Sequence, residues 1–227
     1  MKLVIFDCDG TLADSQHAIV TAMTQAFERH NREAPLRNDV LSVVGLSLHI
    51  AISDLLPDGT SDRDIDDLAQ SYKNAFHDLR RDPTFHEPLY PGIKNLIEDL
   101  GAQDDVLLGV ATGKSDRGLH TLLDREGVRD QFATLQTADH HPSKPDPAMI
   151  QAALNETGVD AENAIMIGDT TFDVLMARAA SVYALGVDWG YHPASDLIAA
   201  GAPRVATSAD EIATITRDVF AVPVRNN

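Results

Sequence analysis

Cysteine is nearly absent from this chain: one residue, Cys8, stands among 227. A single thiol excludes an internal disulfide framework and is consistent with a reducing compartment. We expect Cys8 to act as a small buried hydrophobe rather than as a nucleophile.

Long apolar runs are also missing. No stretch approaches the roughly 20 residues that a membrane-spanning helix requires. Only four apolar residues separate Lys2 from Asp7, too few for the apolar core of a signal peptide. We therefore expect a cytoplasmic protein that has no membrane as a partner.

Basic residues are scarce, with 18 Lys and Arg against 35 Asp and Glu and a net charge of −17. Nucleic acids and anionic membranes require a basic surface, so the charge argues against both as partners. An anionic substrate would need a local cluster of positive charge. The hydrophobic fraction of 44% is that of an ordinary globular protein, and the length suits one core domain with a smaller insert.

Short apolar runs alternate with helical patterns through much of the chain. These runs lie at residues 3–6, 106–111, 132–137, 164–167 and 182–187. Strands that alternate with helices form right-handed crossovers and a parallel sheet covered on both faces. The sequence therefore predicts an α/β fold, a Rossmann-like three-layer sandwich with a central parallel sheet.

The long segment between the first two strands has only helical periodicity, with apolar residues at helical spacing in 19–27, 50–56 and 65–79. We therefore expect an all-helical cap at residues 16–86, inserted into a core made of residues 1–15 and 87–227. The insert begins beside Asp7 and Asp9, where it can serve as a lid.

Two acids, Asp7 and Asp9, follow the first strand. Functional side chains of parallel sheets lie just beyond the carboxyl ends of the strands. Two carboxyls placed there repel each other and raise each other's pKa unless a cation or a proton intervenes. The alternative is a polar turn in which Asp9 and Gly10 are turn residues.

Two later strand ends offer groups that can bind phosphate. After the second strand, the Thr112 hydroxyl and the backbone amide of Gly113 suit phosphate oxygens, although Ser115 can equally cap the next helix. Further along, Pro145 biases Lys144 toward an extended conformation, which gives the cation a defined direction. Surface solvation is the alternative for this lysine.

A fourth strand end provides two more carboxylates. Asp169 follows a buried strand directly, and Asp173 comes four residues later, about one helical turn. Oxygen ligands of this kind suit Mg²⁺, and a capped helix start is the alternative. The adjacent His140 and His141 face different ways, so we interpret them as loop residues.

Together these groups supply what phosphoryl transfer requires: positioned carboxylates, a phosphate cradle and a cation. The set resembles the haloacid dehalogenase superfamily, in particular its phosphoglycolate phosphatase-like branch. The helical insert and the return at Tyr90-Pro91-Gly92 also resemble that branch. The matching motifs are Asp7-Cys8-Asp9-Gly10-Thr11, Thr112-Gly113-Lys114, Lys144-Pro145-Asp146-Pro147 and Gly168-Asp169 through Asp173.

The resemblance implies a Mg²⁺-dependent phosphatase that hydrolyses a small phosphorylated metabolite, with phosphoglycolate favoured. Asp7 would attack phosphorus and form an aspartyl-phosphate, and Asp9 would act as the acid and base. Thr112 and Gly113 would bind phosphate oxygens, while Lys144 would neutralise them and orient Asp7.

The resemblance also implies a metal set and a substrate-facing loop. Asp7, the backbone carbonyl of Asp9 and Asp169 would hold Mg²⁺, and Asp173 would support the site. Gly45, in the loop of residues 44–47, would face the substrate. Arg80 and Arg81 have the charge to bind a second anionic group, with surface solvation as the alternative.

Other functions of the same fold stay open. A β-phosphoglucomutase-like mutase keeps both acids but usually has an apolar residue where Thr11 stands, and a pyrophosphatase is a further alternative. Asp9 argues against a dehalogenase, and the expected exposure of Lys73, the only lysine of the insert, argues against a phosphonate hydrolase. A non-catalytic regulator that binds a phosphorylated ligand is the alternative outside the enzymes.

Overall fold

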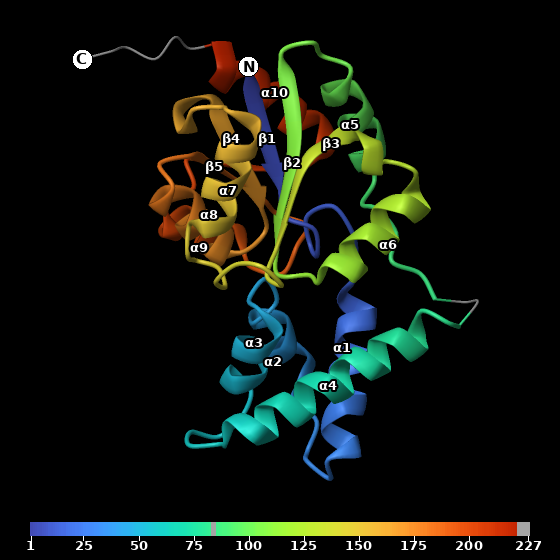
Figure 1. The fold of residues 1–227 in the computed structure, drawn as a ribbon. Helices are drawn as coiled ribbons and strands as arrows, with labels where there is room; N and C mark the ends of the chain where they lie inside the picture. The colour runs from blue at the N-terminus through green and yellow to red at the C-terminus, as the bar shows by residue number, and fades with distance from the viewer. Residues whose placement is uncertain (83–84, 222–227) are drawn as a thin grey trace.

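The computed structural model describes residues 1–82 and 85–221, and the described chain contains a sheet of six parallel strands (Figure 1). The order of the strands is β3-β2-β1-β4-β5-β6. Their bounds are β1 (Lys2–Phe6), β2 (Val106–Thr112), β3 (Phe132–Thr137), β4 (Ala164–Gly168), β5 (Tyr183–Val187) and β6 (Arg204–Ala206).

The first strand lies in the middle of the sheet, between β2 and β4. Phe6 at its end is in register with Val110 of β2 and Ile167 of β4. The carboxyl ends of these three strands therefore meet at one edge. The residues that follow them in sequence are brought together by the strand pairing alone.

Helices cover both faces of the sheet, as the α/β prediction requires. Val4 and Phe6 of β1 pack with one helical layer, and Leu3 and Ile5 pack with the other. This division follows from the alternation of side chains along a strand. The first layer contains α5 (Ile93–Gly101), α6 (Asp116–Glu126) and α10 (Ala209–Ala221), and the second α7 (Ala148–Thr157), α8 (Thr171–Ala179) and α9 (Ala194–Ala200). The 3₁₀ turns η1 (Arg129–Gln131) and η2 (Ala161–Asn163) precede β3 and β4.

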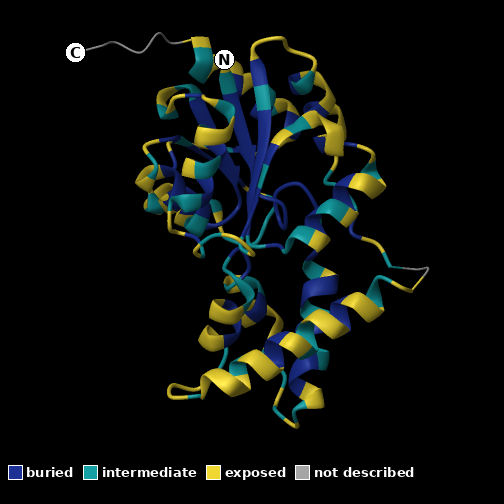
Figure 2. Ribbon diagram, viewed as in Figure 1, coloured by how far each residue is buried: buried dark blue, intermediate teal, exposed yellow. Residues whose placement is uncertain are grey.

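Four helices lie beyond the carboxyl edge of the sheet and pack on one another (Figure 1). They are α1 (Gln16–Arg29), α2 (Arg37–Ser42), α3 (Leu48–Asp54) and α4 (Asp62–Leu79). Their buried residues form a hydrophobic cluster separate from the two clusters of the sheet, and their outer faces are exposed (Figure 2). The sequence did not predict α2, because Val40 is its single buried residue and no periodic pattern marks it.

The two chain segments that join this helical group to the sheet lie side by side. The Asp14 amide donates to the Pro88 carbonyl at 2.9 Å, and the Tyr90 amide donates to the Leu12 carbonyl at 2.9 Å. An antiparallel bridge between Ala13 and Leu89 completes the pairing. Among the described residues, no helix is both long enough and apolar enough to cross a membrane.

Candidate active site

Three of the predicted acids meet at the carboxyl edge of the sheet. Asp7 follows β1, Asp169 follows β4, and Asp173 lies in the first turn of α8. One oxygen from each lies within 4.8 Å of the others, and none of the three residues is more than 1% exposed. The strand register explains why Asp7 and Asp169 are neighbours, because Phe6 and Ile167 pair just before them.

The electrostatics of this acidic cluster call for additional positive charge. Burial, opposed by the positive charge of Lys144 and assisted by the negative charge of Asp173, raises the pKa of Asp7 to about 7. Burial, followed by the charges of Asp7 and Asp173, also holds the pKa of Asp169 well above its usual range. Neither oxygen of Asp7 accepts a hydrogen bond of regular geometry. Buried carboxylate oxygens with free lone pairs fit a divalent cation such as Mg²⁺.

Lys144 lies among these acids instead of on the surface. The residue is 1% exposed, and its Nζ atom is 2.8 Å from Asp7 Oδ1 and 2.6 Å from Asp173 Oδ1. Burial alone would lower the pKa of Lys144, but the carboxylates of Asp173 and Asp7 raise it above its ordinary value. The lysine therefore stays protonated and holds Asp7 in one orientation.

Asp173 caps the start of α8 and also contacts Lys144. Its Oδ2 accepts from the Thr170 amide at 3.0 Å, and its own amide donates to the Thr170 hydroxyl at 3.3 Å. This reciprocal pair is a capping box at the start of α8. The other oxygen, Oδ1, contacts Lys144, so one side chain begins a helix and belongs to the acidic cluster.

Asp169 is held by two donors that the sequence analysis did not identify. The Thr11 hydroxyl donates to Oδ1 at 2.7 Å, and the Tyr191 amide donates to Oδ2 at 2.9 Å. The turn also needs glycine at position 10, where φ is +89° and a Cβ atom would lie 2.3 Å from Asp169 Oδ2. Tyr191 lies in the loop after β5, where no motif marks it.

The carboxylate of Asp9 stands apart from the acidic cluster. Its Oδ1 accepts from Lys114 Nζ at 2.6 Å, and the same ammonium lies 3.1 Å from Oε1 of Glu87. The sequence analysis did not assign a role to Lys114 or to Glu87. Glu87 is a lone acid in the segment that returns from the helical group, and nothing in its sequence context distinguishes it.

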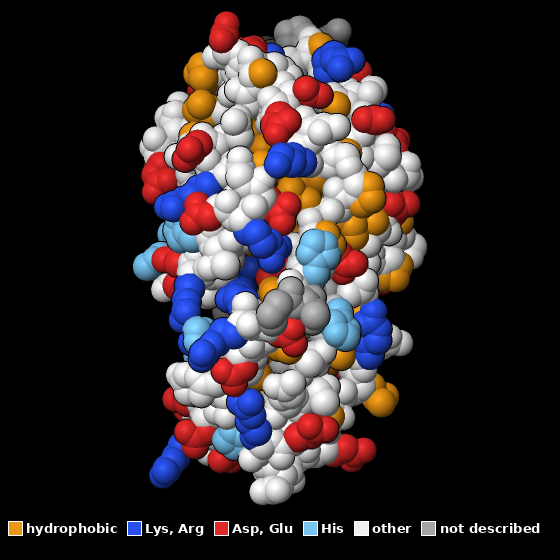
Figure 3. Space-filling model, turned by 90° about the vertical axis from the view of Figure 1, so that its right-hand side faces the viewer, with side chains coloured by type: hydrophobic (Ala, Val, Ile, Leu, Met, Phe, Trp, Pro, Cys, Tyr) orange, Lys and Arg blue, Asp and Glu red, His pale blue; other side chains and the backbone are white. Residues whose placement is uncertain are grey.

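A cavity of about 690 Å³ lies between the four-helix group and the sheet. Asp7, Asp9, Thr112 and Gly113 line its floor from the core, whereas Lys144, Asp169 and Asp173 are not part of the lining. Cationic side chains line the cavity as well, namely Lys73, Arg80, Lys114 and Arg117. Figure 3 shows Lys, Arg and His side chains gathered at mid-height on the face where α4 and α6 approach each other.

The predicted loop around Gly45 lies directly on the predicted phosphate cradle. A Cβ atom on Gly113 would lie 2.6 Å from the Gly45 carbonyl oxygen, and Gly45 has a φ of +101°. The Ser47 amide donates to the Ser143 hydroxyl at 2.7 Å, one residue before Lys144. The Thr112 hydroxyl accepts from the Lys114 amide at 3.2 Å. Arg80 is half-buried and lines the cavity, whereas Arg81 is exposed.

This contact predicts the effect of Gly113→Ala. The added methyl group would displace the loop of residues 44–47, because the carbonyl oxygens of Gly45 and Leu46 lie too close to accommodate it. We expect a loss of about 1–3 kcal/mol in the free energy of unfolding and faster hydrogen exchange at the Ser47 amide. Urea denaturation and exchange mass spectrometry measure these effects. Unchanged values in both would show that the loop does not press on Gly113.

Comparisons with known proteins identify the family of this chain. The family model for haloacid dehalogenase-like hydrolases matches residues 4–187. A protein of Dickeya dadantii named "Probable phosphatase IndB" is 34% identical over 207 residues, covering 89% of this chain and 87% of that protein. A phosphoglycolate phosphatase of Pseudomonas putida is 30% identical over 193 residues, covering 84% of this chain and 71% of that protein.

The same fold occurs in the crystal structure of a hydrolase from Pseudomonas syringae. The two share 24% identity with a TM-score of 0.83, and the match covers 96% of this chain and 99% of that one. The match runs from within β1 to the end of β5 and includes the segments that carry Asp7, Thr112, Lys144 and Asp169. The chain belongs to the haloacid dehalogenase-like hydrolases.

Proposed function

We propose that the protein is a Mg²⁺-dependent phosphatase that hydrolyses a small-molecule phosphate monoester through an aspartyl-phosphate on Asp7. The position of Asp7 carries this proposal. Asp7 is the member of the acidic cluster that lines the cavity, and its oxygens accept no hydrogen bond of regular geometry. Lys144, which is not part of the cavity lining, lies 2.8 Å from Asp7 Oδ1. A carboxylate with free lone pairs that faces a cavity can act as a nucleophile.

In the first step, an oxygen of Asp7 attacks phosphorus in line, and the bond between phosphorus and the ester oxygen breaks. Asp9, which lines the same cavity, gives its proton to the departing alkoxide. In the second step, the ionised Asp9 takes a proton from water as the water oxygen attacks phosphorus. The bond to Asp7 then breaks, and orthophosphate and the free carboxylate result.

The remaining predicted residues bind and neutralise the phosphoryl group. The hydroxyl of Thr112 and the amide of Gly113 would bind the phosphoryl oxygens at the cavity floor. Lys144 would neutralise part of the phosphoryl charge and orient Asp7. Asp7, Asp169 and the Asp9 carbonyl would hold Mg²⁺, with Asp173 in support, and the bound ion would supply the positive charge that phosphoryl transfer demands.

A phosphoglycolate-like substrate is the specific class that we favour. The relative from Pseudomonas putida carries that name. Arg80, Arg117 and Lys73 line the cavity of a chain whose net charge is −17, so positive charge gathers where a second anionic group would lie. We also propose that residues 16–86 form a cap unit and that Gly45 faces the substrate. The separate hydrophobic cluster of the four helices supports that division.

Metal removal tests the role of the acidic cluster. Treatment with EDTA is expected to abolish phosphate release, and added Mg²⁺ is expected to restore it. Mg²⁺ is also expected to raise the melting temperature, because an ion that binds only the folded state stabilises it. Asp169→Asn should lose this thermal shift. Full activity after exhaustive chelation, or an unchanged thermal shift in Asp169→Asn, would contradict the metal assignment.

A substrate screen tests the reaction class. Phosphate release and kcat/KM would be measured over alkyl phosphates, sugar phosphates, nucleotides and pyrophosphate, since that ratio measures discrimination. The highest value is expected for a short phosphate ester with a carboxylate, such as phosphoglycolate. Isomerised sugar phosphate without release of phosphate would identify a mutase. Absence of turnover with Mg²⁺ across the panel would favour a phospho-ligand-binding regulator.

A further inference from the structure

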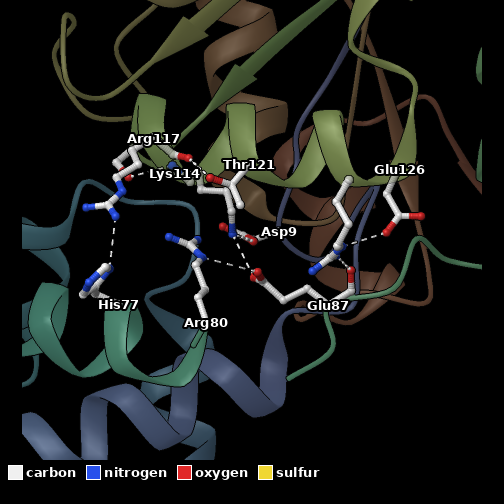
Figure 4. Close-up of polar contacts among 11 residues, drawn as sticks. Asp9, His77, Arg80, Glu87, Lys114, Arg117, Thr121 and Glu126 are labelled. Carbon is white, nitrogen blue, oxygen red and sulfur yellow. Dashed lines mark hydrogen bonds and ion pairs between the residues drawn. The ribbon is translucent and has the colours of Figure 1, made fainter. Parts of the chain in front are cut away.

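A buried ionic cluster joins Asp9 to the segment that returns from the helical group (Figure 4). Lys114 Nζ lies 2.6 Å from Asp9 Oδ1 and 3.1 Å from Glu87 Oε1. The side chains of Lys114 and Glu87 are 6% and 2% exposed. The lysine therefore lies between two carboxylates, one of which lines the cavity and one of which does not.

Glu87 is fixed from several directions. Arg80 at the end of α4 places its Nε atom 3.8 Å from Glu87 Oε2. Arg125 of α6 donates to the Glu87 backbone carbonyl and also pairs with Glu126 at 3.0 Å. Arg125 thus holds the backbone of Glu87, Arg80 lies beside its carboxylate, and the carboxylate contacts the ammonium of Lys114.

Stability alone does not explain such a cluster. Removing a lysine and a glutamate from water costs free energy that their attraction often fails to offset, and apolar side chains of similar size are frequently as stable. Lys114 is buried beside the ring of Phe76, 5.4 Å from its centroid, where an apolar residue would also pack. A buried charge at this position is better explained by what it does to Asp9.

The contact with Lys114 makes the two carboxylate oxygens of Asp9 different from each other. Lys114 binds Oδ1, and within residues 1–82 and 85–221 no hydrogen-bond donor reaches Oδ2. The Asp9 side chain is 12% exposed and lines the cavity. One oxygen is therefore fixed, and the other is free to exchange a proton with a bound molecule.

We infer that Lys114 and Glu87 are positioning residues for Asp9: Lys114 fixes Oδ1 so that Oδ2 faces the ester oxygen, and Glu87 fixes Lys114. The inference rests on the proposed role of Asp9 as proton carrier. Glu87 does not line the cavity and acts only through Lys114, whose ammonium is engaged by the carboxylates of Asp9 and Glu87. The effect of losing either residue should therefore depend on how much the leaving group needs a proton.

Two substrates separate this role from a general structural one. Nitrophenolate leaves p-nitrophenyl phosphate with little help from an acid, whereas the alkoxide of an alkyl phosphate such as phosphoglycolate must be protonated. In Lys114→Met, rapid-quench kinetics should show a first turnover of the alkyl ester slowed by roughly 10²-fold or more. The first release of nitrophenolate should stay within about threefold of wild type and appear as a burst, because the following hydrolysis step also needs Asp9.

Glu87→Gln should show the same selective pattern with a smaller loss, because it keeps the shape of Glu87 and removes its charge. In the double variant, first turnover of the alkyl ester should be no slower than in Lys114→Met, since residues that act through one another are not additive. The double variant also removes both buried charges, so it still tests the inference if the single variant Lys114→Met misfolds. Lys2→Met, which breaks a surface pair with Asp105, is the matched control and should behave as wild type.

Equal slowing of both substrates in Lys114→Met, or additive losses in the double variant, would overturn the inference. Asp7→Asn, assayed in parallel, separates this failure from failure of the proposed function. If Asp7→Asn retains turnover, the proposed mechanism is wrong. If Asp7→Asn is inactive while Lys114→Met slows both substrates equally, the mechanism stands and only the positioning role is lost.

Discussion

Asp7→Asn is expected to lower kcat by at least about 10³-fold, because the amide cannot form the aspartyl-phosphate. In the wild-type enzyme, acid quench during turnover followed by mass spectrometry should find phosphate on the peptide that contains Asp7. The variant should show no such adduct. Retention of turnover near the wild-type rate would refute the nucleophile assignment.

Stability measurements ensure that this loss is chemical and not a loss of fold. The fold raises the pKa of Asp7 from 3.8 to about 7, so the folded state binds this proton more tightly than the unfolded state does. As pH rises through that range, the ionised carboxylate destabilises the folded state. Without metal at pH 8, Asp7→Asn should therefore unfold at the same or a higher urea concentration than wild type.

Lys144→Met should produce the largest loss of stability. Lys144 is buried between Asp7 and Asp173, and without it the acidic cluster has no cationic side chain in contact among the described residues. Loss of one partner from a buried ion pair costs about 3–5 kcal/mol, and urea denaturation at pH 8 measures this. The loss should shrink at pH 5, where protonation relieves the repulsion, and Mg²⁺ should recover part of it.

Lys94→Met provides the comparison for Lys144→Met. Lys94 is an exposed lysine of α5 that donates to the Glu126 carbonyl, and its replacement should change the free energy of unfolding by no more than about 0.5 kcal/mol. Activity of Lys144→Met should also be lost at every Mg²⁺ concentration, since Asp7 loses its orientation. Stability equal to that of wild type would contradict the assigned position of Lys144.

The sequence predicted the parts of the site that follow strand ends. Asp7, Thr112 and Asp169 stand directly at or after apolar runs, and parallel pairing alone brings those runs together. The three-layer fold followed from the same alternation. The predicted cap at Asp173 is present, and the second oxygen of the same carboxylate contacts Lys144, so the position of Asp173 also permits the proposed site role.

The parts of the site that the sequence did not predict depend on contacts between distant segments of the chain. Glu87 gains its partners only because α4 and α6 converge on the return segment, and Tyr191 reaches Asp169 only through the loop after β5. No local pattern encodes such contacts. Lys114 belongs to the motif Thr112-Gly113-Lys114, yet its contact with Asp9 depends on the course of the backbone after β2.

The paired connections between the sheet and the helical group have an evolutionary consequence. Where Asp14 and Tyr90 bond the opposite segment, the chain leaves the core and re-enters it at a single place. The segment between these two connections can then become longer or shorter or change its sequence, while the register of β1 and the hydrogen bonds next to Asp7 stay unchanged. Under the proposed function, natural selection can thus alter which substrates the site accepts and leave the reaction chemistry intact.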